Sequence, residues 1–284
     1  MSQDPAADPK EMVREEWTAA APYWKKWNVK LASQSRAATE SVVRGAELAP
    51  GMHVLDLASG TGEPALSLAQ AVGPTGRVVA TDLVPAMLQA ISELAGTQGL
   101  KHMEFKVADA ESLPFKDSEF DRVTCRFGIM FFPEIQKALG EVRRVLKPGG
   151  SVSFATWGSL AENPLFATAV GPFMKRLNVP PPPPDAPHVF RFAEETKLAN
   201  TLSAAGFARV KASKEQVAWP WPGPPEEAWE SMKELAAPFR KLIAALPPGE
   251  MESVVAEVMD GIRRFYDGKS VNFPATILTG TAAN

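Results

Sequence analysis

The chain has 284 residues, 45% of them hydrophobic, which is enough to bury a full core in one large domain with an appended lid. Its net charge of −3 excludes the strongly basic footprint of a nucleic-acid-binding domain, and its one cysteine excludes a disulfide within the chain. Residues 1–10 lack the apolar core of a signal peptide, and no apolar run is long enough to cross a membrane. We expect a cytoplasmic protein that acts on a small molecule, and a homodimer stays open.

The stretch from Val54 to Leu66, VLDLASGTGEPAL, has the pattern of a buried strand, a glycine turn and the start of a helix. Gly60 and Gly62 lack a Cβ, so the backbone can bend sharply there and let a ligand approach closely. Pro64 suits a helix start because its missing N–H would have had no partner there. Units of this kind bind nucleotide-like cofactors.

Strands and helices alternate regularly after this unit. Apolar residues at helical spacing after Pro85 predict one helix. A second set predicts another helix over 135–146. The additional strands are expected at 77–82, 103–108, 120–127 and 151–157. This alternation predicts a parallel sheet with helices on both faces.

The N-terminal residues 11–33 are predicted to be helical and are unusually aromatic. Trp17, Trp24 and, across a break at Pro22, Trp27 share one face. Packing on the domain is one explanation. The other is a cover over the functional site that brings Tyr23 or Trp24 to it.

The regular alternation ends after Trp157. The proline run 180–184 predicts an extended arm, because such a run fits neither a helix nor a central strand. The remaining elements expected are helices over 163–177, 194–205, 226–246 and 250–266, strands over 207–219 and 271–279, and a breaker at 220–225. We assign the N-terminal helical cover to 1–49, the α/β core to 50–219 plus 269–284, and a helical insertion forming part of a substrate lid to 220–268.

Three acidic residues follow or end successive strands. Ligands of open α/β sheets lie outside the carboxyl ends of the strands, where Asp56, Asp82 and Asp109 are expected. His53 and His102 precede their strands and belong to the opposite edge. The loose pattern from Gly60 to Ala65 also satisfies a dinucleotide motif, so an NAD(P)-dependent oxidoreductase stays open.

This arrangement of acids around a glycine turn resembles the class I S-adenosylmethionine (SAM) methyltransferases. The segments LDLASGTGE, FDRVTCRFG and RVLKPGG, within residues 50–157, resemble the branch that methylates ubiquinone and menaquinone precursors. The resemblance implies a Rossmann-like, seven-stranded, mostly parallel sheet whose last strand is antiparallel. It also implies SAM as the cofactor, and no metal site is predicted.

The resemblance assigns roles to individual residues. Asp82 would bind the ribose hydroxyls, Asp109 and Ala110 would read adenine, and Leu83 and Met87 would enclose the ring. The complete predicted cofactor set is Asp56, Ala58, Ser59, Gly60, Thr61, Gly62, Asp82, Leu83, Met87, Asp109, Ala110, Arg126 and Phe127.

The chain departs from that branch at several positions. Ala58 replaces the first glycine of the motif, and Arg126 stands where the branch often has serine. Arg126 could bind the SAM carboxylate or a substrate anion, or form a structural salt bridge. Residues 158–284 do not match the branch, which leaves the quinone substrate open.

The expected reaction is in-line methyl transfer to a small, largely apolar acceptor, with phenolic or quinone-like compounds as examples. The cofactor supplies the reactive methyl group, and the protein supplies alignment. His188 and Tyr23 are the predicted catalytic bases. The predicted acceptor-binding residues are Trp24, Met130, Phe131, Trp157, Phe190 and Phe192. A methyltransferase-like fold that uses SAM for other chemistry, or that only binds a partner, is a further alternative.

Overall fold

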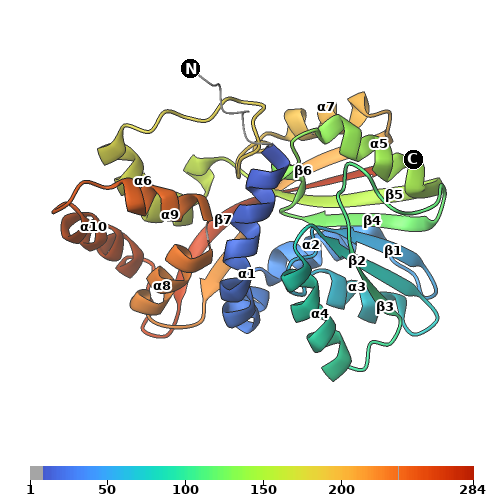
Figure 1. Ribbon diagram of the computed structural model, residues 1–284, viewed down its shortest axis with the longest axis horizontal. Helices are drawn as coiled ribbons and strands as arrows, with labels where there is room; N and C mark the ends of the chain where they lie inside the picture. Colours follow the sequence, from blue (N-terminus) through green and yellow to red (C-terminus); the bar gives the residue numbers. More distant parts are fainter. Residues whose placement is uncertain (1–8, 236) are drawn as a thin grey trace, which may run out of the picture.

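The computed structural model describes residues 9–235 and 237–284, which form one seven-stranded sheet in the order β3-β2-β1-β4-β5-β7-β6 (Figure 1). β7 runs antiparallel to both of its neighbours, whereas the remaining pairs are parallel. The predicted fold class is confirmed. The strands are β1 (His53–Leu57), β2 (Arg77–Asp82), β3 (Met103–Val107), β4 (Phe120–Arg126), β5 (Leu146–Trp157), β6 (Ala208–Trp221) and β7 (Val271–Ala283).

Helices pack on both faces of the sheet because the central strands are apolar on both sides. Val54 and Val78 face a core shared with α3 (Ala65–Val72) and α4 (Pro85–Thr97). Leu55 belongs to a second core on the opposite face. The same face as α3 and α4 carries α2 (Arg36–Ala46), and the opposite face carries α5 (Ile135–Val145) and α7 (Glu195–Ala204).

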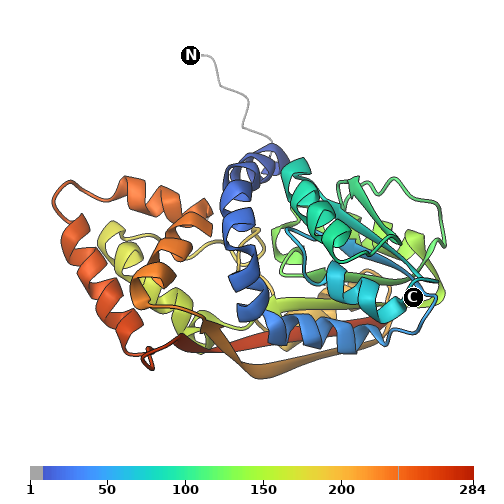
Figure 2. The ribbon, with the colours of Figure 1, turned by 90° about the horizontal axis from the view of Figure 1, so that it is seen from below.

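Four helices form a separate layer beyond the ends of the strands (Figure 2). We call them the lid helices: α6 (Pro164–Leu177), α8 (Pro225–Leu235), α9 (Ala237–Ala245) and α10 (Met251–Arg263). Their centre is aromatic, with Phe173 5.0 Å from Phe239 and 6.2 Å from Trp229 between ring centroids. This centre is continuous with the core on the α5 and α7 face of the sheet, so the lid shares the hydrophobic core of the domain.

Helix α1 (Pro9–Gln34) stands between the lid helices and the α/β core (Figure 2). The predicted break at Pro22 is wrong, since the helix continues through it. An internal proline costs a helix about 3 kcal/mol, and contacts of α1 with α4, α8 and α9 offset this cost. Residues 1–8 of the predicted cover lie outside the described residues. None of the described helices, α1 included, combines the length and apolar character required to cross a membrane.

The β6–β7 pair is longer than the sequence predicted and extends past the rest of the sheet. β6 continues through Pro220, contrary to the predicted breaker, because β6 is an edge strand and a missing N–H is tolerated there. The last partner of β5 is Ile277, whereas β6 pairs with β7 as far as Val271. The predicted helix 226–246 is described as α8 and α9, and residue 236 between them lies outside the described residues.

A buried asparagine fixes the point where this pair leaves β5. Asn163 follows the short helix η2 (Leu160–Glu162), and its Nδ2 donates to the carbonyl oxygen of Thr276 at 3.2 Å. The Thr276 N–H donates back to the Asn163 Oδ1 at 3.0 Å. The Gly158 N–H also donates to the Thr276 carbonyl at 2.8 Å, so the Asn163 side chain supplies the acceptor for the Thr276 N–H that a continued β5 would have supplied.

Candidate functional site

The glycine turn after β1 is tied to the end of β2. Ala58 and Gly60 have φ values of 50° and 57°, in the left-handed region that favours glycine. The Ser59 N–H donates to the carbonyl of Thr81 at 2.9 Å, and the Gly60 N–H donates to the Asp82 Oδ2 at 3.0 Å. The turn and the second acid therefore form one rigid unit.

Asp82 lies at the centre of this unit. Its Oδ1 accepts from the Val84 N–H at 2.9 Å, while its Oδ2 holds Gly60. Burial raises the pKa of its carboxyl, and the backbone N–H donors oppose that shift. Nearby, Leu83 is half-buried, and Met87 packs beneath Trp17 and Trp24 of α1.

Asp56 is fully buried on the face of β1 that carries α2 and α3. Its Oδ1 accepts from the hydroxyl of Thr124 on β4 at 2.6 Å, and its Oδ2 has no hydrogen-bond partner among the described residues. Burial raises the pKa of this carboxyl to about 7, opposed by hydrogen bonds from Thr124 and Ser59 and by the charge of Arg126. A buried carboxylate oxygen without a donor is costly, so this atom is suited to a ligand that donates.

Arg126 ends β4 two residues beyond Thr124, which places it on the same face as Asp56. One of its terminal nitrogens, Nη1, donates to the hydroxyls of Ser35 at 2.5 Å and Thr39 at 2.8 Å. Its Nε is buried and has no partner in the described part of the chain. Burial lowers the pKa of the guanidinium, opposed by the charges of Glu63 and Asp56. Among the described residues, its Nη1 therefore bonds to neutral hydroxyl groups rather than to the carboxylate of a salt bridge.

The two unpartnered atoms provide a test of whether SAM fits. An amino acid ligand carries an ammonium group that donates and a carboxylate that accepts. The Asp56 Oδ2 lacks a donor and the Arg126 Nε lacks an acceptor among described residues, on neighbouring strands next to the glycine turn. These groups are complementary to the methionine end of SAM. The residues present therefore fit the cofactor that the resemblance implies.

The third acid, Asp109, lies just beyond β3. Its Oδ1 accepts from the Glu111 N–H at 2.8 Å, and its Oδ2 accepts from the Lys10 Nζ at 2.6 Å. The same Lys10 ammonium lies 2.6 Å from the Oε2 of Glu111, a residue only 2% exposed. Ala110, between the two acids, is half-buried.

Two of the residues predicted to bind the acceptor, Trp157 and Phe190, lie in an aromatic cluster near the ends of β4 and β5. The cluster consists of Phe127, Trp157, Phe166, Phe190 and Trp219. The rings of Phe127 and Trp157 stack with centroids 4.5 Å apart, and Phe166 meets Phe190 at 5.2 Å. Phe127 has a φ of 62°, so the chain turns at this position as it does at Ala58.

The other predicted acceptor residues are distributed around this cluster. Met130, in the short helix η1 (Ile129–Phe131), and Phe192 are fully buried in the core. Phe131 packs its ring 5.5 Å from Trp17 of α1. The Trp24 Nε1 donates to the carbonyl of Leu235 at 3.2 Å, which links α1 to the lid.

The two predicted bases lie in different places. His188 is half-buried in the loop before α7, and its Nδ1 accepts from the Phe190 N–H at 3.1 Å. Burial, followed by the charges of Lys197 and Arg191, lowers its pKa, which favours the neutral imidazole. Tyr23 lies on the α9 side of α1, with the guanidinium of Arg240 5.4 Å from its ring centroid.

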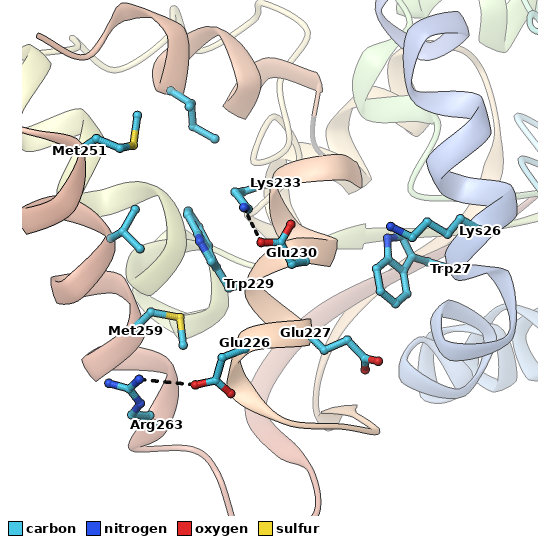
Figure 3. A pocket seen from close by; sticks show the side chains of 12 residues that line it. Lys26, Trp27, Glu226, Glu227, Trp229, Glu230, Lys233, Met251, Met259 and Arg263 are labelled. Carbon is cyan, nitrogen blue, oxygen red and sulfur yellow. Dashed lines mark hydrogen bonds and ion pairs between the residues drawn. The ribbon is translucent and has the colours of Figure 1, made fainter. Parts of the chain in front are cut away.

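A groove of about 790 Å³ lies between α1 and the lid helices (Figure 3). Trp229 and Met259 face it from the lid, and Lys26 and Trp27 face it from α1. Its charged residues are paired, with Glu230 2.6 Å from Lys233. The groove therefore combines apolar walls with neutralised charges.

Sequence reasoning missed the residues of α1, and those at the start of α2, that touch the site. The Asn28 Nδ2 donates to the carbonyl of Thr61 at 2.7 Å, Lys10 contacts Asp109, and Ser35 and Thr39 hold Arg126. Polar residues on an amphipathic helix have no pattern that separates these contacts from solvent exposure. Pairing across such sequence distances is visible only in the fold.

We expect Gly60→Ala to lower the free energy of unfolding by roughly 1–2 kcal/mol, because its φ of 57° is left-handed. A Cβ at this position meets nothing within 4 Å, so the loss comes from the backbone alone. Thermal unfolding measures it. Gly96→Ala, in α4 with similar open space, is the control and should gain about 1 kcal/mol. Equal effects at both positions would contradict the argument.

Comparison with known proteins places the chain in a family. Residues 23–179 match the model of the ubiE/COQ5 methyltransferase family. The ubiquinone/menaquinone biosynthesis C-methyltransferase UbiE of Bordetella avium is 42% identical over 117 residues, which are 41% of this chain and 45% of that protein. The matched part thus spans less than half the length of the curated relatives.

Solved structures share the fold at low sequence identity. The YcgJ protein of Bacillus subtilis superimposes with a TM-score of 0.57 at 21% identity, covering 88% of this chain and 98% of that one. The [4+2]-cyclase SpnF does so with a TM-score of 0.53 at 20% identity, covering 98% of each chain. The family model spans more than half of the 284 residues, including the glycine turn and all three acids. The chain therefore belongs to the ubiE/COQ5 methyltransferase family, within the class I SAM-dependent methyltransferases that its motifs resemble.

Proposed function

We propose that the protein transfers a methyl group from SAM to a small, largely apolar acceptor. The observation that carries the cofactor assignment is the pair of unpartnered buried atoms, the Asp56 Oδ2 and the Arg126 Nε. They complement the ammonium and carboxylate groups of an amino acid. Family membership supports the same cofactor.

The protein's own part in the reaction is binding and alignment. SAM, when bound, supplies an activated methyl group on a positively charged sulfur. Asp82 would accept from the ribose hydroxyls, and the 58–62 turn would hold the methionine part. Because positive charge at the sulfur is lost during transfer, apolar surroundings do not oppose the reaction. Holding the two reactants in line is then the main contribution of the chain.

The aromatic cluster supports an apolar acceptor. Phe127 and Phe190 are half-buried and follow or flank the strand ends, where an open α/β sheet binds its ligands. Flat rings stack on such side chains. A phenol or quinone-like acceptor fits this chemistry, with His188 as the base where a hydroxyl must lose its proton.

The first experiment is calorimetry of the purified protein with SAM, S-adenosylhomocysteine and NADH. We expect micromolar binding of the first two ligands and none of NADH. Binding of NADH alone would contradict the proposal and support the dinucleotide interpretation of the glycine turn.

The second experiment is a turnover assay that detects S-adenosylhomocysteine released with a panel of phenols, catechols and hydroquinones. Release that depends on the acceptor is the expected result. The assay is needed because the fold also occurs in a [4+2]-cyclase, so the fold alone does not fix the reaction. Binding of SAM without turnover on any class of acceptor would favour a protein that uses the same fold for chemistry other than methyl transfer.

A further inference from the structure

Helix α1 contacts several parts of the proposed cofactor site. Asn28 binds the glycine turn through Thr61, and Ala21 packs with Val84 and Met87 beside Asp82. Trp17 meets Phe131 beyond β4. Lys10, at the start of the helix, reaches the third acid. One helix thus contacts the glycine turn, the surroundings of Asp82 and the third acid, whereas Arg126 bonds to Ser35 and to Thr39 of α2.

The contact of Lys10 engages the atom that the cofactor needs. The Asp109 Oδ1 accepts from the Glu111 N–H, and the Oδ2, which accepts from no backbone N–H, is the oxygen that we assign to the amino group of adenine. In this structure the Lys10 Nζ lies 2.6 Å from that Oδ2. An ammonium is a stronger partner for a carboxylate than a neutral amine, because the bond is charge-assisted.

Glu111 strengthens the same contact. Its carboxylate is 2% exposed, and its Oε1 accepts from the Glu134 N–H at 2.8 Å while its Oε2 pairs with Lys10 at 2.6 Å. A buried carboxylate that loses its cation is strongly disfavoured. The pair therefore holds the first turn of α1 down against the adenine end of the site.

We propose that Lys10 is a latch that competes with the adenine amino group for Asp109, so that α1 must release this end before SAM or S-adenosylhomocysteine binds or leaves. The proposal rests on the proposed function, because it assigns adenine to Asp109. The apparent affinity is then reduced by the fraction of molecules that are latched. Cofactor exchange is limited by the opening of α1.

The test compares S-adenosylhomocysteine binding in three variants of the full chain. Lys10→Met removes the ammonium and keeps the length of the side chain. Lys10→Met with Glu111→Gln also removes the buried charge that would otherwise be left unpaired. Lys25→Met is the matched control, since Lys25 lies on the same helix and pairs with Glu93 at 2.7 Å where both side chains are about half exposed. Stopped-flow tryptophan fluorescence gives the rates, because Trp17 and Trp24 lie on α1, and calorimetry gives the affinity.

The latch predicts faster association and a dissociation constant lowered roughly three- to tenfold in both Lys10 variants, with Lys25→Met unchanged. Unchanged or weaker binding in the double variant would overturn it. If the wild-type chain binds no SAM or S-adenosylhomocysteine, the proposed function fails, and amide hydrogen exchange judges the latch separately. Faster exchange over residues 9–24 in the double variant but not in Lys25→Met supports the latch, and equal exchange refutes it.

Discussion

Replacing Asp82 by alanine is expected to weaken S-adenosylhomocysteine binding by roughly 100-fold or more. The carboxylate would accept from two ribose hydroxyls, and each hydrogen bond to a charged group contributes about 1.5–3 kcal/mol. The variant also frees the N–H groups of Gly60 and Val84, which Asp82 now holds at 3.0 and 2.9 Å. Loss of the ligand contact and loosening of the turn act in the same direction.

Calorimetry measures this effect, and a thermal unfolding curve establishes that the variant is folded. Asp260→Ala is the control, because its side chain is 70% exposed on α10 in the lid. It should bind as the wild type does. The affinity of Asp82→Asn should lie between those of Asp82→Ala and Asp260→Ala, since an amide retains one acceptor. Undiminished affinity in the folded alanine variant would remove Asp82 from the cofactor site.

The stability of the ligand-free protein is expected to fall as the pH rises from about 4 to 7, through Asp56. Its pKa is 3.8 in a model compound and about 7 in the fold, so the folded state binds more protons than the unfolded state between these values. The contribution of this group is fully present below pH 4 and is lost as the pH passes 7. Its size is about 4 kcal/mol, at about 1.4 kcal/mol per pH unit.

The same group makes cofactor binding depend on pH in the opposite direction. An ammonium ligand favours the carboxylate form, so affinity for S-adenosylhomocysteine should rise as the pH approaches 7, by up to about tenfold per unit. Calorimetry in buffers of different ionisation enthalpy should detect proton release on binding at pH 6.

Asp56→Asn separates these effects from those of other titrating groups. The variant should lose both pH dependences relative to the wild type, whereas Asp260→Asn should keep them. Equal slopes of unfolding free energy against pH in the wild type and in Asp56→Asn would show that Asp56 does not titrate in this range.

The parallel part of the fold was predictable because its signals are local. Val54, Leu55 and Leu57 form a continuous apolar run before the glycines, and the same pattern recurs before Asp82. Each strand can therefore be recognised from its own residues, without knowledge of the strands beside it. The carboxyl-end rule then brings the acids to one edge.

The errors arose where position in the fold outweighs local preference. Pro220 predicts a break, yet it lies in β6, because an edge strand has one side that needs no N–H donor. Pro22 lies within α1, because helices pack against it on two sides. Neither the edge position of β6 nor the packing of α1 can be inferred from the residues next to these prolines.

The positions of the three acids at the carboxyl edge of the sheet were predictable, whereas the side chains that they contact were not. The sequence places Asp56 and Arg126 near strand ends. Which of their atoms are hydrogen-bonded depends on the hydroxyls of Thr124, Ser35 and Thr39, and the sequence does not show that these lie nearby. Lys10 is distant from Asp109 in the sequence, and a lysine near a chain end carries no signature of a buried acid pair. Contacts of this kind depend on how α1 is docked.

The extension of β6 and β7 beyond β5 has a mechanical consequence. Residues 271–276 of β7 pair with β6 alone, which makes a two-stranded arm about 20 Å long at 3.3 Å per residue. Helices α8, α9 and α10 are carried at its tip, and Asn163 clamps its root. Helices α6 and α1 also pack against these helices, so their position is set by the shared core as well as by the two-stranded arm. A change in the segment between β6 and β7 must therefore be matched in α6, because Phe173 packs against Trp229 and Phe239 of that segment.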